Sequence, residues 1–179
     1  MKKFLIGVLG LGMLLILVSC QQVKEKMEKV EPEKIEDVRG ILDKVLAHIA
    51  DHHPELSLDE GQLLDTELGI PRFETVDLSE INHFDDKDIV DGLIVRPVVE
   101  VENPHLLIVV EAVDQEASRN LNQAMVKVKS DQLKQFGDAG ILTKKLVNEG
   151  KAVRQGNFLI YVTWEGAVDI VRVFERHVR

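Results

Sequence analysis

The chain contains a single cysteine, Cys20, so residues 21–179 carry no thiol. This excludes disulfide bonds, thiol catalysis and cysteine metal sites in that part of the chain, and it suits a protein that works outside the cytoplasm. Aromatic residues are also scarce, at 4 %, and we expect Tyr161 and Trp164 to fill the core. The sequence has no glycine-rich phosphate loop and no glycine-flanked serine, which are the signatures of nucleotide binding and of serine hydrolysis.

Basic residues are fewer than acidic residues. The chain has 22 Lys and Arg against 31 Asp and Glu, and its formal charge is −9. Without residues 1–19, in which Lys2 and Lys3 are the charged residues, the charge becomes −11. Nucleic acid is therefore excluded as a partner. The same charge disfavours lying flat on anionic lipid, because such surfaces attract basic residues.

The apolar run at residues 4–18 is too short to cross a membrane, which needs about 20 apolar residues. Lys2 and Lys3 precede the run, and Leu17, Val18, Ser19 and Cys20 end it. An ordinary secretory signal ends instead in a small-x-small cleavage site. The segment resembles the signal peptide and lipobox of a bacterial lipoprotein precursor.

That resemblance implies cleavage between Ser19 and Cys20 and attachment of a diacylglyceryl group to the Cys20 thiol. Two acyl chains suffice for stable membrane attachment, since each buried methylene contributes about 0.8 kcal/mol. We therefore expect a cell-membrane protein that is lipid-anchored on the extracytoplasmic face. Residues 1–19 are then the signal peptide, and the charged residues that follow Cys20 up to position 34 form a linker.

Residues 35–78 are expected to hold an amphipathic helix and then a loop. Apolar residues recur there at three-and-four spacing, which indicates one buried helical face: Ile35, Val38, Ile41, Leu42, Val45, Leu46 and Ile49. Pro54 stops this helix. The glycines and prolines between Pro54 and Leu78 favour a loop with short helical or extended pieces.

Residues 79–179 have the pattern of an α+β domain. Short helices are expected at 79–84 and 86–91, strands at 93–101 and 106–113, a helix capped by Asp114, a shorter helix at 139–147, a hairpin at 151–164 and a final helix. Pro97 places the first strand at an edge or a bulge. The order ββα(α)ββα predicts a four-stranded antiparallel sheet with helices on one face, preceded by the N-terminal amphipathic helix.

Three stretches carry a resemblance to a family of bacterial lipoproteins known as domain of unknown function forty-three fifty-eight. They are residues 86–97 (DKDIVDGLIVRP), the strand at 106–113 with the long charged helix after it, and residues 154–160 (RQGNFLI) with the terminal helix. The chain lacks the tyrosines expected ahead of the edge strand and in the helical region. The resemblance covers a little over half the chain and implies this fold and an envelope location. It implies no activity.

His48 and His52 are the weak candidates for a metal site, because two histidines four positions apart on a helix can chelate zinc. No Glu lies between them as in the zinc protease motif, and the pair is also explained as the polar end of an amphipathic helix. A second polar cluster contains His83, Asp85, Asp86, Asp88 and Asp91. Its spacing does not fit a calcium loop, and helix capping explains it better. We expect no metal, no cofactor and no catalytic residue.

Two functions remain open from the sequence. The first is a noncatalytic envelope module that binds a protein, a peptide or a cell-wall component beside the membrane. The alternative is an envelope hydrolase that uses His and Asp side chains, with or without a metal. A deep pocket with converging His and Asp side chains would favour the hydrolase, and a shallow surface patch would favour binding.

Overall fold

The computed structural model describes residues 35, 37–52, 73–81, 83–98 and 103–178. Residues 33–179 belong to one compact unit. The expected signal peptide, Cys20, the linker and most of the expected loop at 54–78 lie outside the described residues. Within the described part, no helix is long and apolar enough to cross a membrane.

The described residues form an α+β fold around an antiparallel sheet, which confirms the predicted class. The sheet has five strands in the order β1-β2-β3-β5-β4. Their bounds are β1 Phe73–Asp77, β2 Ile89–Pro97, β3 Leu106–Ala112, β4 Lys151–Gln155 and β5 Phe158–Thr163. The prediction of four strands was wrong, because β1 lies in the stretch that we expected to be a loop.

Strand β1 also corrects the position of its neighbour. It pairs with β2 from Phe73 opposite Pro97 to Asp77 opposite Leu93, so β2 is an interior strand and β1 is the edge. Pro97 is the last residue of β2. Its missing N–H therefore falls where the strand ends, not at an edge or a bulge.

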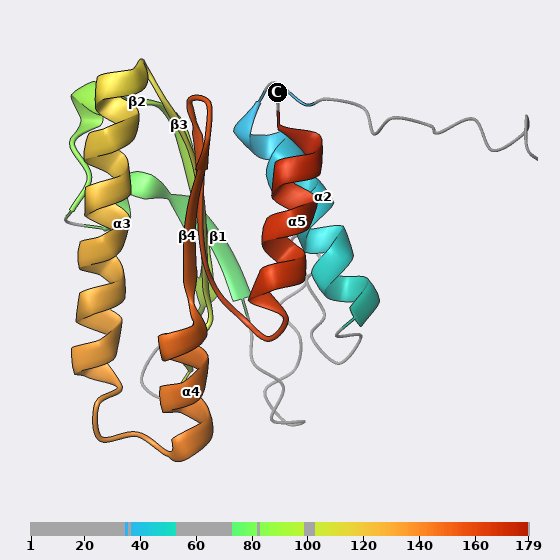
Figure 1. The fold of residues 1–179 in the computed structure, drawn as a ribbon, viewed down its shortest axis with the longest axis vertical. Coiled ribbons are helices and arrows are strands. Elements are labelled where there is room, and N and C mark those ends of the chain that lie inside the picture. Colours follow the sequence, from blue (N-terminus) through green and yellow to red (C-terminus); the bar gives the residue numbers. More distant parts are fainter. Residues whose placement is uncertain (1–34, 36, 53–72, 82, 99–102, 179) are drawn as a thin grey trace, which may run out of the picture. The chain divides into compact units, whose positions relative to one another are not determined.

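Helices cover both faces of the sheet, and the expectation of one covered face was wrong (Figure 1). The reason lies in strand β3, whose residues are apolar on both sides. Leu107 and Val109 pack into a core with helices α2 and α5, whereas Leu106 and Ile108 pack into a second core with helix α3. Exposure of either apolar face of such a strand to water would destabilise the fold.

The described part of the chain contains four α-helices, which are α2 Val38–His52, α3 Gln115–Gln135, α4 Ile141–Glu149 and α5 Ala167–His177. Helix α3 begins where the sequence places it, because the Asp114 carboxylate accepts hydrogen bonds from the N–H groups of Glu116 and Ala117, both at 2.8 Å. The hairpin between β4 and β5 turns through Gly156 and Asn157. Gly156 has a φ of 60°, which favours glycine at that position.

The connection from β1 to β2 crosses the α3 side of the sheet. It contains two single-turn 3-10 helices, Leu78–Glu80 and Asp86–Asp88. Leu78 packs into the α3-side core, and Ile81 and Phe84 pack against that core. This path brings His83 into contact with helix α3.

Candidate functional site

A cleft among the described residues has a volume of about 350 Å³. It lies between the C-terminal half of α3, the connection after β1, the end of β2 and the start of β3. Its lining combines charged, amide and apolar side chains: Glu80, Ile81, His83, Arg96, Pro97, Asn103, His105, Leu106, Val128, Asp131, Gln132, Gln135 and Phe136. This volume is at the lower end of the range for small-ligand sites.

One wall of the cleft is a contact between the β1–β2 connection and helix α3. The Nε2 atom of His83 lies 2.5 Å from Oδ2 of Asp131, and the two side chains are 31 % and 51 % exposed. Lys134 donates a hydrogen bond to the other carboxylate oxygen at 3.1 Å. These hydrogen bonds, that of His83 first, lower the pKa of Asp131.

A second charged group enters from the sheet. Arg96 on β2 lies opposite Glu74 on β1, and its Nε donates to the Glu74 carboxylate at 2.9 Å. Its Nη2 lies 3.7 Å from the carboxylate of Glu80. The guanidinium therefore has two carboxylate partners, of which Glu80 also lines the cleft.

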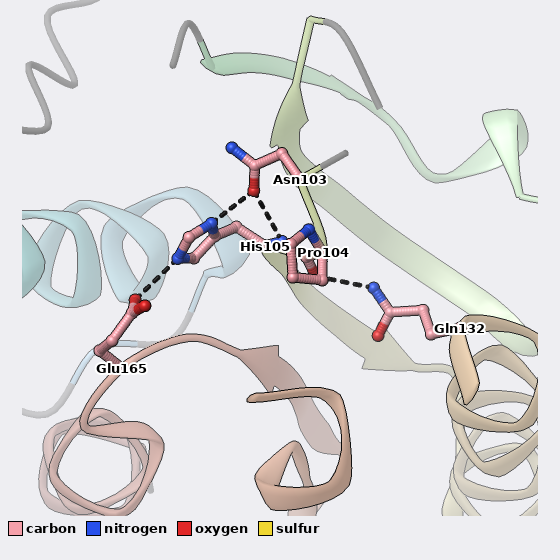
Figure 2. A network of polar contacts seen from close by, with 5 residues as sticks. All are labelled: Asn103, Pro104, His105, Gln132 and Glu165. Atoms are coloured by element: carbon pink, nitrogen blue, oxygen red, sulfur yellow. Dashed lines mark hydrogen bonds and ion pairs between the residues drawn. The ribbon is translucent and has the colours of Figure 1, made fainter. Parts of the chain in front are cut away.

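A polar network holds the start of β3 against two other elements (Figure 2). The backbone N–H of His105 donates to Oδ1 of Asn103 at 3.0 Å, and the same oxygen accepts from Nδ1 of the imidazole. On the other side of the ring, Nε2 lies 2.7 Å from the Glu165 carboxylate. Gln132 on α3 donates from Nε2 to the carbonyl of Pro104 at 2.9 Å.

Gln132 also belongs to a buried cluster of three oxygens. Its Oε1 lies 2.7 Å from the Tyr161 hydroxyl and 2.8 Å from the Thr163 hydroxyl, and the two hydroxyls are 2.9 Å apart. Two hydroxyl hydrogens serve three contacts, so at most two are hydrogen bonds at once. Burial raises the pKa of Tyr161 to about 12. The cluster fixes the Gln132 side chain at the back of the cleft.

The ring of His105 also touches the aromatic part of the core. Its centroid lies 4.6 Å from that of Trp164 and 5.9 Å from that of Phe73. Trp164 is the only tryptophan of the chain and is 1 % exposed. Its indole N–H has no hydrogen-bond partner in the described part of the chain. The fluorescence of the chain therefore reports on one buried ring that contacts a residue of the cleft.

The two predicted metal candidates lie elsewhere, at the C-terminal end of α2. His52 donates from Nδ1 to the backbone carbonyl of His48 at 2.8 Å, and the two ring centroids are 4.2 Å apart. Burial, followed by the neighbouring His52, lowers the pKa of His48. The pair lines a separate cavity of about 80 Å³ beside the start of α5. No group of three or more His, Cys, Asp or Glu suited to a metal ion occurs in the described part of the chain.

The structure separates His83 from the aspartates that follow it in the sequence. Asp85 caps the second 3-10 helix by accepting from the N–H of Lys87 at 3.2 Å. Asp88 accepts from the side chain of Asn120 at 3.0 Å, and Asp91 accepts from the N–H of Gly92 at 2.8 Å. None of these three aspartates lines the cleft, and Asp85 is the one among them that caps a helix.

Sequence reasoning missed most residues of the cleft. Arg96, Asn103, Asp131, Gln132 and Gln135 belong to segments that were assigned only structural roles. The local signals around them are a strand, a turn and a charged helix, and no motif links them. Only the pairing of β1 with β2 and the packing of α3 on the sheet bring them together.

The lining residues determine which chemistry the cleft can offer. Its described lining contains no Ser, Thr, Cys, Tyr or Lys side chain that could act as a nucleophile. The His83 and Asp131 pair provides a proton donor and acceptor at one wall. The other lining groups offer hydrogen bonds and apolar contact.

Comparisons of the chain with known protein families, with curated proteins and with solved structures find no match. The candidate site therefore rests on the geometry of this chain.

Proposed function

We propose that the chain is a lipoprotein of the bacterial envelope, anchored to the extracytoplasmic face of the cell membrane through Cys20. Its folded domain binds an envelope ligand in the cleft without converting it. The anchor is supported by the lipobox pattern at Leu17–Cys20 and by the short apolar run before it. Membership of the family of unknown function is part of the same proposal and is supported by the stretches quoted above.

The observation that supports a binding function is that the charged side chains of the cleft contact one another. Arg96 is balanced by Glu74 and Glu80, and His83 is held by Asp131. The Arg96 guanidinium and the carboxylates around it are therefore directed at one another and not at a ligand. His83 contacts Asp131 through Nε2 alone, and its second nitrogen is what the hydrolase alternative would use. The described lining of the cleft holds no Ser, Thr, Cys, Tyr or Lys side chain.

Retention of the protein on insoluble envelope material tests this proposal. The purified full-length chain in detergent is mixed with that material and sedimented. We expect the protein in the pellet and no soluble fragments released from the material. Gln135→Trp, which fills the mouth of the cleft, should abolish retention. Gln123→Trp is the matched control, because Gln123 is exposed on the same helix and outside the cleft.

The hydrolase alternative is favoured by one observation, the 2.5 Å contact between His83 and Asp131. In that case the same assay should release soluble fragments, and His83→Ala should stop the release. Equal retention of the two tryptophan variants would contradict binding in the cleft. Release that depends on His83 would replace the binding function with the hydrolase.

A further inference from the structure

The ionisable side chains that line the cleft each contact an ionisable side chain of the opposite kind, so each already has an internal partner. The guanidinium of Arg96 is 2.9 Å from Glu74, His83 is 2.5 Å from Asp131, and His105 is 2.7 Å from Glu165. A charged ligand would lose its hydration and would have to compete with one of these internal partners. Burial of a charge without a partner costs several kcal/mol.

Two amide side chains of the lining have polar groups without a hydrogen-bond partner among the described residues. The Gln135 side chain has no hydrogen-bond partner among the described residues, and it is exposed at the mouth of the cleft. Asn103 uses its Oδ1 for His105, while its Nδ2 has no partner there (Figure 2). An amide supplies both a donor and an acceptor, which is the complement of another amide.

The remaining surface of the cleft is apolar. Leu106 and Phe136 are 8 % and 6 % exposed, and Pro97 and Ile81 lie in the same lining. Small-ligand sites commonly combine such an apolar surface with a few polar groups that orient the ligand. A ligand with an apolar group next to amides meets both kinds of surface.

We propose that the cleft selects an uncharged ligand that carries amide groups beside an apolar group. This inference rests on the proposed binding function and specifies its ligand class. A volume of about 350 Å³ suits a small fragment. The required chemistry occurs both in a peptide and in an N-acetylated sugar.

The test uses the full-length chain in detergent and three probes. The first is N-acetyl-alanyl-alanine methylamide, which is uncharged, and the second is the same dipeptide with a free carboxylate. The third is the disaccharide of N-acetylglucosamine, which separates the sugar source from the peptide source. Binding is measured by calorimetry and by the fluorescence of Trp164, whose ring contacts His105 of the cleft.

We expect at least one uncharged probe to bind, and the carboxylate form to bind about tenfold more weakly than its methylamide. The affinity of the uncharged probe should be equal at low and high salt, because screening acts on charge. Gln135→Leu should weaken its binding by about fivefold, the worth of one neutral hydrogen bond. Gln123→Leu is the matched control and should leave the affinity unchanged.

Tighter binding of the carboxylate form, or an affinity that falls with salt, would overturn the inference in favour of an anionic ligand. Equal binding to the Gln135→Leu and Gln123→Leu variants would also overturn it, as would failure of both uncharged probes to bind at about millimolar concentration. These failures leave the retention assay unaffected. The retention assay tests the proposed binding function separately. Loss of retention, or equal retention of the two tryptophan variants, would contradict that function.

Discussion

The imidazole of His83 and the carboxylate of Asp131 meet at 2.5 Å although 48 positions separate them in the chain. One residue comes from the connection between β1 and β2, and the other comes from helix α3. The contact joins the edge of the sheet to the helix that covers its centre. It forms a wall of the cleft that is absent unless both elements are in place.

The first prediction concerns this contact and its pH dependence. Hydrogen bonds from His83 and Lys134 lower the pKa of Asp131 in the folded protein. The carboxylate therefore stabilises the fold above its unfolded pKa, and this stability is lost as the pH falls through the folded pKa. Asp131→Asn should unfold at a lower temperature than the unmodified chain at neutral pH, and the difference should shrink in acid.

Thermal unfolding followed by circular dichroism measures this difference across the acid range. Asp138→Asn is the control, because Asp138 is exposed and lies outside the cleft. A difference for Asp131→Asn that stays constant down to strongly acidic pH would show that its carboxylate has no such role.

The second prediction concerns Glu111 on β3, which lies directly opposite Asp91 on β2. Burial, followed by the charges of Asp91 and Asp37, raises the pKa of Glu111. Ionisation of this group therefore opposes folding. The penalty is absent below the unfolded pKa and complete above the folded pKa.

Glu111→Gln should stabilise the protein at neutral pH by about 0.5 kcal/mol, the scale of a like-charged cross-strand pair. The gain should vanish when the pH falls below the unfolded pKa of glutamate, about 4.3. Urea unfolding at the two pH values measures it. A gain of the same size in acid would mean that charge repulsion is not its cause.

The third prediction uses the only tyrosine of the chain, Tyr161. Its hydroxyl is buried against Gln132 and Thr163, and burial raises its pKa to about 12. The absorbance of tyrosinate should therefore appear only near that pH in the folded protein. Tyr161→Phe should cost about 1 kcal/mol, because it removes one buried hydroxyl and leaves the Thr163 contact in place. A titration near 10 in protein that is still folded would contradict this environment.

Much of the C-terminal half could be predicted because its signals are local. Asp114 caps α3 through its immediate neighbours, and Gly156 with Asn157 closes a hairpin of two adjacent strands. Such contacts connect residues that are close in sequence, so a short window contains the whole signal.

The rest depends on partners that are distant in sequence. Strand β1 has five residues, and only its pairing with β2 makes it a strand. The sequence shows that β3 is apolar on both sides. It does not show that α2 and α5 pack together on one of those sides, which is what covers the second face. The cleft was missed for the same reason, since Arg96 on β2 approaches Asp131 and Gln135 only when helix α3 packs on the sheet.

The fourth prediction concerns the anchor. Cys20→Ala removes the thiol that would accept the diacylglyceryl group, so the variant should carry no fatty acid and should remain unprocessed or be secreted. Labelling of cells with radioactive palmitate, followed by fractionation, measures both effects. Ser57→Ala serves as the control and should be labelled normally. Fatty acid on the Cys20→Ala protein would contradict the lipoprotein assignment.

Photo-crosslinking in intact cells tests the central claim, ligand binding in the cleft of an envelope protein, most directly. A photoreactive residue replaces Gln135 at the mouth of the cleft or, as the control, Gln123 on the same helix. The full chain with its Cys20 anchor is irradiated in the cells that produce it. The account predicts a crosslinked product of higher mass from position 135 and none from position 123. Identical products from the two positions, or none from position 135, would contradict it.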